Sequence, residues 1–293
     1  MIKSVGLVGY GYWGPKLARC FKQLGVLTVI ADSDSSRRNK AMEEQGVPSY
    51  GTLEAILDYV DSVDAISVAT PPGTHYEIVK KALEAGKDVF IEKPMTTKVV
   101  QAIHLTDLAT QKGLNLMVGH IYLYNSGIKV MPIPVGKAEL YVQLLNEKGG
   151  PSPSTRDILW AALPHACSLA LHFFPDEPES IWAQRDKDRI RVNLNYWNGS
   201  SAYLDVGDNT GRKLRRVELR IGTTRYFFDT KEPTLCTLYS GILKNEWIGD
   251  VPYTEPLMVE CMEFLNYKGV DPMGPKVVKL IEDIVSECKP KGT

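Results

Sequence analysis

Near its start the chain reads Val5-Gly6-Leu7-Val8-Gly9-Tyr10-Gly11-Tyr12-Trp13-Gly14, an apolar run that enters three glycines with Gly-x-Gly-x-x-Gly spacing. Pro15 follows at the first position where a helix could begin. The pattern predicts a strand, a tight turn and a helix N-terminus, in which the glycines let the backbone approach a pyrophosphate and free N–H groups bind it. An ordinary glycine-rich turn is the alternative, because this spacing alone has low specificity.

A second apolar run, residues 26–31, ends in Asp32, about 20 residues beyond the glycines. An acidic side chain there can accept hydrogen bonds from a ribose diol, or it can cap the next helix. A carboxylate about 4 Å from a 2′-phosphate would cost roughly 4 kcal/mol at an effective dielectric near 20, so Asp32 favours NAD over NADP. Arg37 and Arg38 could offset that repulsion, which leaves NADP as an alternative cofactor.

The composition favours a globular protein with a small-molecule partner. The 293 residues are 44% hydrophobic and 24% charged. Their formal net charge of −1 gives no broad electrostatic field that would attract nucleic acid or acidic membranes. Five cysteines stand far apart without a Cys-x-x-Cys pair, so neither a disulfide framework nor a metal site is expected. With no signal-peptide pattern and no apolar run of membrane-spanning length, we expect a cytoplasmic protein.

Strand and helix patterns alternate through residues 1–120, which predicts a doubly wound, mostly parallel Rossmann sheet. In such sheets ligands bind beyond the carboxyl ends of the strands. Because each of the following residues comes directly after an expected strand, we expect them to line one crevice: Gly9, Asp32, Thr70, Lys93 and His120.

The alternation stops around Tyr122, and we expect a second, α+β domain over residues 121–293 with an open, largely antiparallel sheet. Residues 191–196 alternate apolar and polar side chains, as expected for a strand with one buried face. The apolar and aromatic side chains of these strands suggest packing between subunits, as a homodimer or homotetramer.

Several separate stretches together resemble a known family, the Gfo/Idh/MocA oxidoreductases, named for glucose-fructose oxidoreductase and inositol dehydrogenase. The likeness covers nearly the whole chain. The stretches, in the family's order and approximate spacing, are Gly9 to Gly14, Ala69-Thr70-Pro71 with His75, Glu92-Lys93-Pro94, Gly119-His120, Tyr124-Asn125, Asp157-Ile158-Leu159-Trp160 with Pro164-His165, and Glu255-Pro256-Leu257 ending in Phe264.

The resemblance implies hydride transfer between a nicotinamide and a hydroxyl or ketone of a sugar, nucleotide-sugar or polyol, with Lys93 and His165 as the catalytic pair. An ammonium at Lys93 would stabilise a developing alkoxide, and His165, in a first helical turn after Pro164, would be a neutral base. The expected cofactor contacts are Gly9, Gly11, Tyr12, Trp13, Gly14, Asp32, Arg37, Thr70, Pro71, His75, Glu92 and Lys93. The expected substrate contacts are His120, Tyr122, Tyr124, Asn125 and Asp157.

The chain departs from the family's pattern around the expected base. Many members carry an aspartate four residues before this histidine and another acid just after it, whereas this chain has Ala161, Ala166 and Ser168. One alternative is therefore a regulatory or sensor protein that binds NAD(P) without turnover. Another is different chemistry on the same fold, as in biliverdin reductases and NAD-dependent glycosidases.

Overall fold

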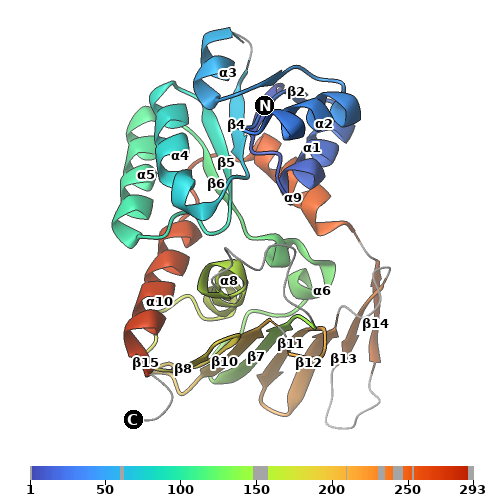
Figure 1. Cartoon of the computed structure of the whole chain (residues 1–293). Coiled ribbons are helices and arrows are strands. Elements are labelled where there is room, and N and C mark those ends of the chain that lie inside the picture. The colour runs from blue at the N-terminus through green and yellow to red at the C-terminus, as the bar shows by residue number, and fades with distance from the viewer. Residues whose placement is uncertain are drawn as a thin grey trace. The chain divides into compact units, whose positions relative to one another are not determined.

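The computed structural model describes residues 2–59, 63–147, 158–208, 210–229, 235–239, 247–252 and 254–289. The chain divides into two compact units (Figure 1). The first unit comprises Met1–His120 and Leu257–Val278, and the second comprises Ile121–Pro256 and Lys279–Thr293.

The first unit contains a six-stranded sheet with the order β3-β2-β1-β4-β5-β6, in which every pairing is parallel. The order reverses direction between β1 and β4, which is where doubly wound sheets bind their ligands. The predicted Rossmann sheet is confirmed. Its strands are β1 (Val5–Val8), β2 (Leu27–Ala31), β3 (Ser49–Tyr50), β4 (Ala65–Val68), β5 (Asp88–Glu92) and β6 (Leu116–Gly119).

The helices of this unit begin and end where the local sequence dictates. Asp34 caps α2 by accepting a hydrogen bond from Ser36 N at 2.8 Å, and Gly46 ends it with φ 70°. The elements are α1 (Gly14–Gln23), α2 (Ser35–Gln45), α3 (Leu53–Tyr59), η1 (Pro72–Thr74), α4 (His75–Glu84), α5 (Val99–Lys112) and α9 (Pro256–Asn266), followed by the start of α10 (Met273–Glu287).

Residues 257–278 correct the domain boundaries predicted from the sequence, which assigned them to the second domain. Phe264 of α9 packs its ring 5.5 Å from that of Phe90 in β5, and Val270 forms a parallel bridge with Leu116 of β6. Val278 joins the apolar core of the first sheet. The sequence shows that α9 has an apolar stripe, but it does not show which sheet the stripe covers.

The second unit contains a nine-stranded sheet with the order β14-β13-β12-β11-β7-β10-β9-β8-β15 (Figure 1). Most pairings are antiparallel, and β10–β7 and β15–β8 are parallel, so the predicted largely antiparallel sheet is confirmed. The strands are β7 (Ala138–Leu145), β8 (Ser180–Asp186), β9 (Arg189–Asn195), β10 (Ser201–Gly207), β11 (Leu214–Ile221), β12 (Thr224–Asp229), β13 (Leu235–Tyr239), β14 (Trp247–Pro252) and β15 (Cys288–Lys289).

The buried face of this sheet packs against α8 (Leu163–Phe173), which contacts β7 and β10. Along β7 the burial alternates, with Leu140, Val142 and Leu144 buried and the residues between them only partly covered. The remaining helices are η2 (Ile121–Tyr124), α6 (Ser126–Lys129) and α7 (Ile158–Ala161). Among the described residues, no helix is long and apolar enough to span a membrane.

Candidate functional site

The glycine turn after β1 has the close backbone approaches that a dinucleotide cradle requires. A Cβ atom on Gly9, where φ is 100°, would lie 2.6 Å from Ala69 O, and one on Gly14 would lie 2.1 Å from Gly9 O. A Cβ on Gly11 would instead face open space, with Arg37 Nη1 3.8 Å away. Pro15 stands in the first turn of α1, and the N–H groups of a first helical turn are free to bind an anion, so this turn fits a pyrophosphate.

Asp32 braces the same turn. Its carboxylate accepts hydrogen bonds from Tyr10 N at 2.7 Å and from Asp34 N at 2.9 Å. Asp34, not Asp32, caps α2, so the capping alternative for Asp32 is wrong. Arg37 Nη1 lies 3.9 Å from the Asp32 carboxylate on a side chain that is 53% exposed, which places a cation next to the glycine turn.

His75 links the backbone after β4, at Thr70, to the backbone after β5, at Pro94, and Pro71 precedes η1. The buried His75 ring lies with Nδ1 2.8 Å from Pro94 O and Nε2 2.8 Å from Thr70 O, and the Lys93–Pro94 bond is cis. Burial lowers the pKa of His75 below its usual range, against the opposing effect of these carbonyls. The described contacts of His75 are thus structural, and they fix the backbone at Lys93.

Tyr12 and Trp13 extend from the glycine turn as an aromatic pair with 6.4 Å between ring centroids. Tyr12 is 61% exposed, and Lys16 Nζ lies 4.0 Å from its ring centroid. The Trp13 indole N–H makes no well-formed hydrogen bond to any described residue, yet it lies close enough to Glu92 to lower the pKa of that carboxyl.

Glu92 and Lys93 stand at the carboxyl end of β5. Glu92 accepts a hydrogen bond from Lys93 N at 3.2 Å. Burial raises the pKa of Glu92 to about 7, against the opposing effects of Lys93, Trp13 and Lys16. A carboxyl group that titrates near neutrality beside a lysine is typical of an active site.

The sequence analysis missed Glu260 of α9, the second buried carboxyl of this unit. Glu260 is fully buried, and neither of its carboxyl oxygens has a hydrogen-bond partner among the described residues. Burial first, and Glu92 second, raise the pKa of Glu260 far above its ordinary value of 4.5. The sequence pattern could have predicted that Glu260 is buried, because Glu260 lies on the apolar stripe of α9 with Leu257, Cys261 and Phe264.

His120 follows β6 in the same unit. It is buried, and within the described part of the chain neither ring nitrogen has a hydrogen-bond partner. Burial lowers the pKa of His120, while the Asp271 carboxylate raises it and Lys93 lowers it further. An imidazole that is neutral and has both nitrogens available suits a polar ligand group.

In the second unit the structure brings Tyr122 and His165 together, with 4.9 Å between their ring centroids. Tyr124 lies beneath Lys129 Nζ, 5.0 Å from its ring centroid, and Asn125 caps α6 by accepting a hydrogen bond from Gly127 N at 2.9 Å. The Asn125 side-chain oxygen thus already holds a helix in place. Asp157 lies outside the described residues.

Arg215 of β11, which the sequence analysis did not identify, lies beside the Tyr122 phenol. Burial raises the pKa of Tyr122, and Arg215 lowers it both as a positive charge and as a hydrogen-bond donor. Arg215 stands opposite Leu144 of β7, so it shares the buried face of the sheet.

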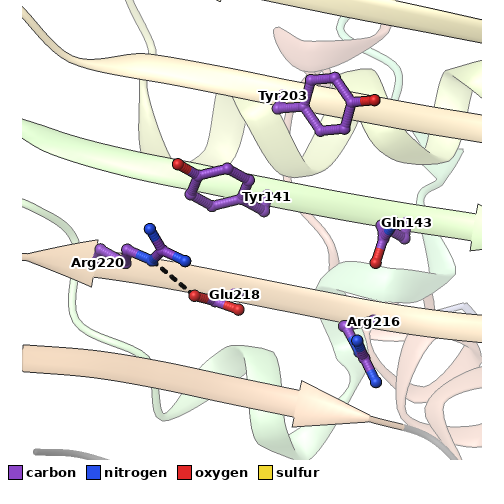
Figure 2. A pocket seen from close by; sticks show the side chains of 6 residues that line it. All are labelled: Tyr141, Gln143, Tyr203, Arg216, Glu218 and Arg220. Carbon is purple, nitrogen blue, oxygen red and sulfur yellow. Dashed lines mark hydrogen bonds and ion pairs between the residues drawn. The ribbon is translucent and has the colours of Figure 1, made fainter.

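The open face of the same sheet carries a polar hollow of about 140 Å³ (Figure 2). In it Glu218 accepts a 2.6 Å hydrogen bond from Arg220 Nε, and the Arg220 guanidinium lies 4.6 Å from the Tyr141 ring centroid. The lining residues, none of them predicted as a site residue, are Tyr141, Gln143, Tyr203, Arg216, Glu218 and Arg220.

Comparison with known proteins decides the family. A family model described as an oxidoreductase family with an NAD-binding Rossmann fold matches residues 3–120. Residues 3–120 belong to the Gfo/Idh/MocA oxidoreductase family. The predicted family, the oxidoreductase class and the use of NAD(P) are confirmed.

Two relatives differ in how much of the chain they match. The UDP-N-acetylglucosamine 3-dehydrogenase of Acidithiobacillus ferrooxidans is 29% identical over 89% of this chain and 87% of that protein. An uncharacterized oxidoreductase of Streptococcus pneumoniae serotype 4 is 33% identical over 42% of this chain, and the match spans only 33% of that relative's length.

Solved structures share the fold over nearly the whole chain. A structure of the Acidithiobacillus dehydrogenase has a TM-score of 0.88 at 21% identity, covering 97% of both chains. A 3-ketoreductase from Actinomadura kijaniata, solved with NADP and TDP-benzene, has a TM-score of 0.84 at 19% identity and covers 99% of this chain and 98% of its own. Both units therefore have the architecture of these proteins.

Proposed function

We propose that the chain transfers a hydride between NAD(P) and a hydroxyl or keto group of a sugar or nucleotide-sugar. The observation that carries this proposal is Lys93, which directly follows the buried Glu92 in the unit that contains the glycine cradle. The relatives named above, a UDP-N-acetylglucosamine 3-dehydrogenase and a 3-ketoreductase, favour this substrate class.

NAD(P) would be held by the glycine turn, with its pyrophosphate at the N-terminus of α1 and its ribose at Asp32. When bound, the nicotinamide accepts or supplies the hydride. We keep NAD as the expected cofactor because of the Asp32 carboxylate, with Arg37 able to meet a 2′-phosphate. The other proposed contacts are Gly9, Gly11, Tyr12, Trp13, Gly14, Thr70, Pro71, His75, Glu92 and Lys93.

Two side chains carry the proton chemistry in this proposal. The Lys93 ammonium hydrogen-bonds the reacting oxygen and stabilises its developing negative charge. His165, at the first turn of α8 where the helix dipole favours neutral imidazole, takes the hydroxyl proton as the hydride leaves. The proposed substrate contacts are His120, Tyr122, Tyr124, Asn125 and Asp157.

The direct test follows NAD(P)H absorbance against a panel of sugars and nucleotide-sugars, including UDP-N-acetylglucosamine. Lys93→Ala should lower kcat about 100-fold or more, because it removes both a charge and a hydrogen bond from the transition state. Lys93→Met is the matched control for packing, and it should be as inactive as Lys93→Ala. Full activity in either variant contradicts the role of Lys93.

A second candidate function is an NAD(P)-binding sensor without turnover. Ala161 and Ala166 favour it, since neither residue can supply a carboxylate to His165, and the Ser168 hydroxyl donates to the backbone oxygen of His165 at 2.9 Å. Calorimetry separates the two functions. Cofactor binding without turnover on any substrate supports the sensor, and robust turnover excludes it.

We also propose that the chain forms a homodimer or homotetramer through the open face of the second sheet. Its rows of opposite charges, such as Arg216–Asp229 at 3.5 Å, are suited to a second copy of the same surface. Multi-angle light scattering should give at least twice the mass of 32.6 kDa. A monomer at assay concentration contradicts the proposal.

A further inference from the structure

The first turn of α1 carries a lysine whose ammonium group lies against two aromatic rings. Lys16 Nζ is 4.0 Å from the ring centroid of Tyr12 and 4.2 Å from that of Trp13. Side chains of an α-helix point back toward its N-terminus, so Lys16 returns over the two residues that precede Gly14. The ammonium therefore stands against residues of the glycine turn itself, and the ring faces attract its charge.

This position is electrostatically unfavourable for a cation unless an anion lies nearby. The N-terminus of a helix carries a partial positive charge, which acidic side chains usually compensate. The first turn of α1 contains no acidic residue. Arg37, a second cation next to the glycine turn, differs in this respect, because carboxylate oxygens of Asp32 and Asp34 each lie 3.9 Å from its guanidinium. An anion bound at the glycine turn would supply the negative charge that the first turn of α1 lacks.

The glycine turn has room for such an anion, and Lys16 has donors for it. Among the described residues beyond its chain neighbours, Arg37 Nη1 would be the nearest to a Cβ on Gly11, at 3.8 Å. Tyr12 is 61% exposed, so the ring beneath the ammonium is open to solvent. An ammonium has three N–H donors, and a phosphate oxygen accepts stronger hydrogen bonds than a ring face does. Lys16 can therefore bind a phosphate oxygen from its position on the rings.

We propose that Lys16 is a binding residue for the pyrophosphate of NAD(P), with Tyr12 and Trp13 holding its ammonium group in place. The inference rests on the proposed function, in which the pyrophosphate lies at the N-terminus of α1. There the N–H groups of the first helical turn hydrogen-bond the phosphate oxygens, and Lys16 adds a full positive charge. Because the rings already restrict the lysine side chain, less conformational entropy is lost when the anion binds.

The test is isothermal titration calorimetry of the full chain with ADP-ribose, which contains the pyrophosphate and lacks the nicotinamide. Lys16→Met keeps an unbranched side chain over the rings and removes the charge, so the Kd for ADP-ribose should rise about 10-fold. Lys16→Arg keeps the charge and the stacking on the rings, and its Kd should stay within about 3-fold of wild type. Added NaCl should weaken binding more in wild type than in Lys16→Met, because salt screens the charge that the variant lacks.

Lys22→Met is the matched control, because Lys22 lies in the last turn of the same helix, where its Nζ donates a hydrogen bond to Glu44 O at 3.2 Å. Its Kd for ADP-ribose should equal that of wild type. Without ligand, Lys16→Met should unfold at nearly the wild-type temperature, since removing a cation from the helix N-terminus opposes the loss of the ring contacts. A wild-type Kd in Lys16→Met would overturn the proposal, and so would a large drop in its unfolding temperature, which would make the role of Lys16 structural.

A second ligand separates the dinucleotide from the diphosphate of a nucleotide-sugar. If Lys16→Met bound UDP-N-acetylglucosamine more weakly and ADP-ribose as tightly as wild type, the assignment of Lys16 to the dinucleotide would be wrong. Because ADP-ribose cannot take part in hydride transfer, its binding is measured without turnover. The expected loss of affinity in a chain that shows no turnover would support the role of Lys16 and count against the proposed function alone.

Discussion

Two buried carboxylates of the second unit, Glu218 and Asp205, contrast with Glu260 of the first unit. In the second unit Glu218 accepts 2.6 Å hydrogen bonds from both Arg220 and Arg225, and Asp205 is held at 2.6 Å by Arg189 Nε. In the first unit Glu260 is fully buried, and both of its oxygens lack a hydrogen-bond partner among the described residues. A buried carboxyl group can thus be held by hydrogen bonds from arginine, or it can lack such a partner, in which case burial raises its pKa.

The carboxylates that are paired with arginine have a structural role. The paired acids join neighbouring strands of a sheet, where a fixed charge pair supports a fixed register. Glu260 instead has no such partner among the described residues, and burial together with the nearby Glu92 carboxyl raises its pKa. Carboxyl groups with a raised pKa are common at functional sites, and Glu92 and Glu260 are two such groups in the first unit.

The largest effect on stability is expected from breaking a paired charge. Arg189→Met would leave the Asp205 side chain, which is 1% exposed, as an uncompensated buried charge. The expected loss is about 3–5 kcal/mol of unfolding free energy, measured by urea denaturation with circular dichroism. Arg189→Met combined with Asp205→Leu should recover most of it. A single variant as stable as wild type would contradict the scaffold role of this pair.

A smaller effect, dependent on pH, is expected at Glu260. Because its pKa is raised on folding, the stability from this group is complete below about pH 4.5 and is lost as pH rises toward the folded-state pKa. Glu260→Gln cannot lose this proton, so its stability relative to wild type should improve by up to about 1.4 kcal/mol per pH unit between pH 5 and 7.

Urea titrations of both proteins across that range provide the measurement. Glu263→Gln, on the exposed side of the same helix, is the matched control and should show little change with pH. Parallel stability curves for wild type and Glu260→Gln would mean that Glu260 is not held neutral by the fold.

The smallest effect is expected at Tyr196, whose buried phenol oxygen has no hydrogen-bond partner in the described part of the chain. Tyr196→Phe removes an unsatisfied polar atom and keeps the ring on Phe174, so stability should rise by about 1 kcal/mol or less. Thermal denaturation checks the sign. A loss of stability would show that the Tyr196 phenol makes a stabilising hydrogen bond.

The first unit was more predictable than the second because its motifs are local. The turn from Gly9 to Gly14 and the Glu92-Lys93-Pro94 stretch each specify a strand end within a few residues, and parallel topology then gathers strand ends at one edge. The break between α7 and α8 at Ala162 could not be predicted, since the residues on both sides of it have helical patterns.

The sequence by itself determined the Rossmann unit, the family, the oxidoreductase class and the use of NAD(P), because glycine spacing and strand-end residues act over short distances. Only the tertiary structure decided that α9 brings Glu260 to the first sheet and that Arg215 meets Tyr122 beside His165. The reason is that burial and stacking depend on residues far apart in the chain. Their effects on charge and orientation arise only when packing removes water between them.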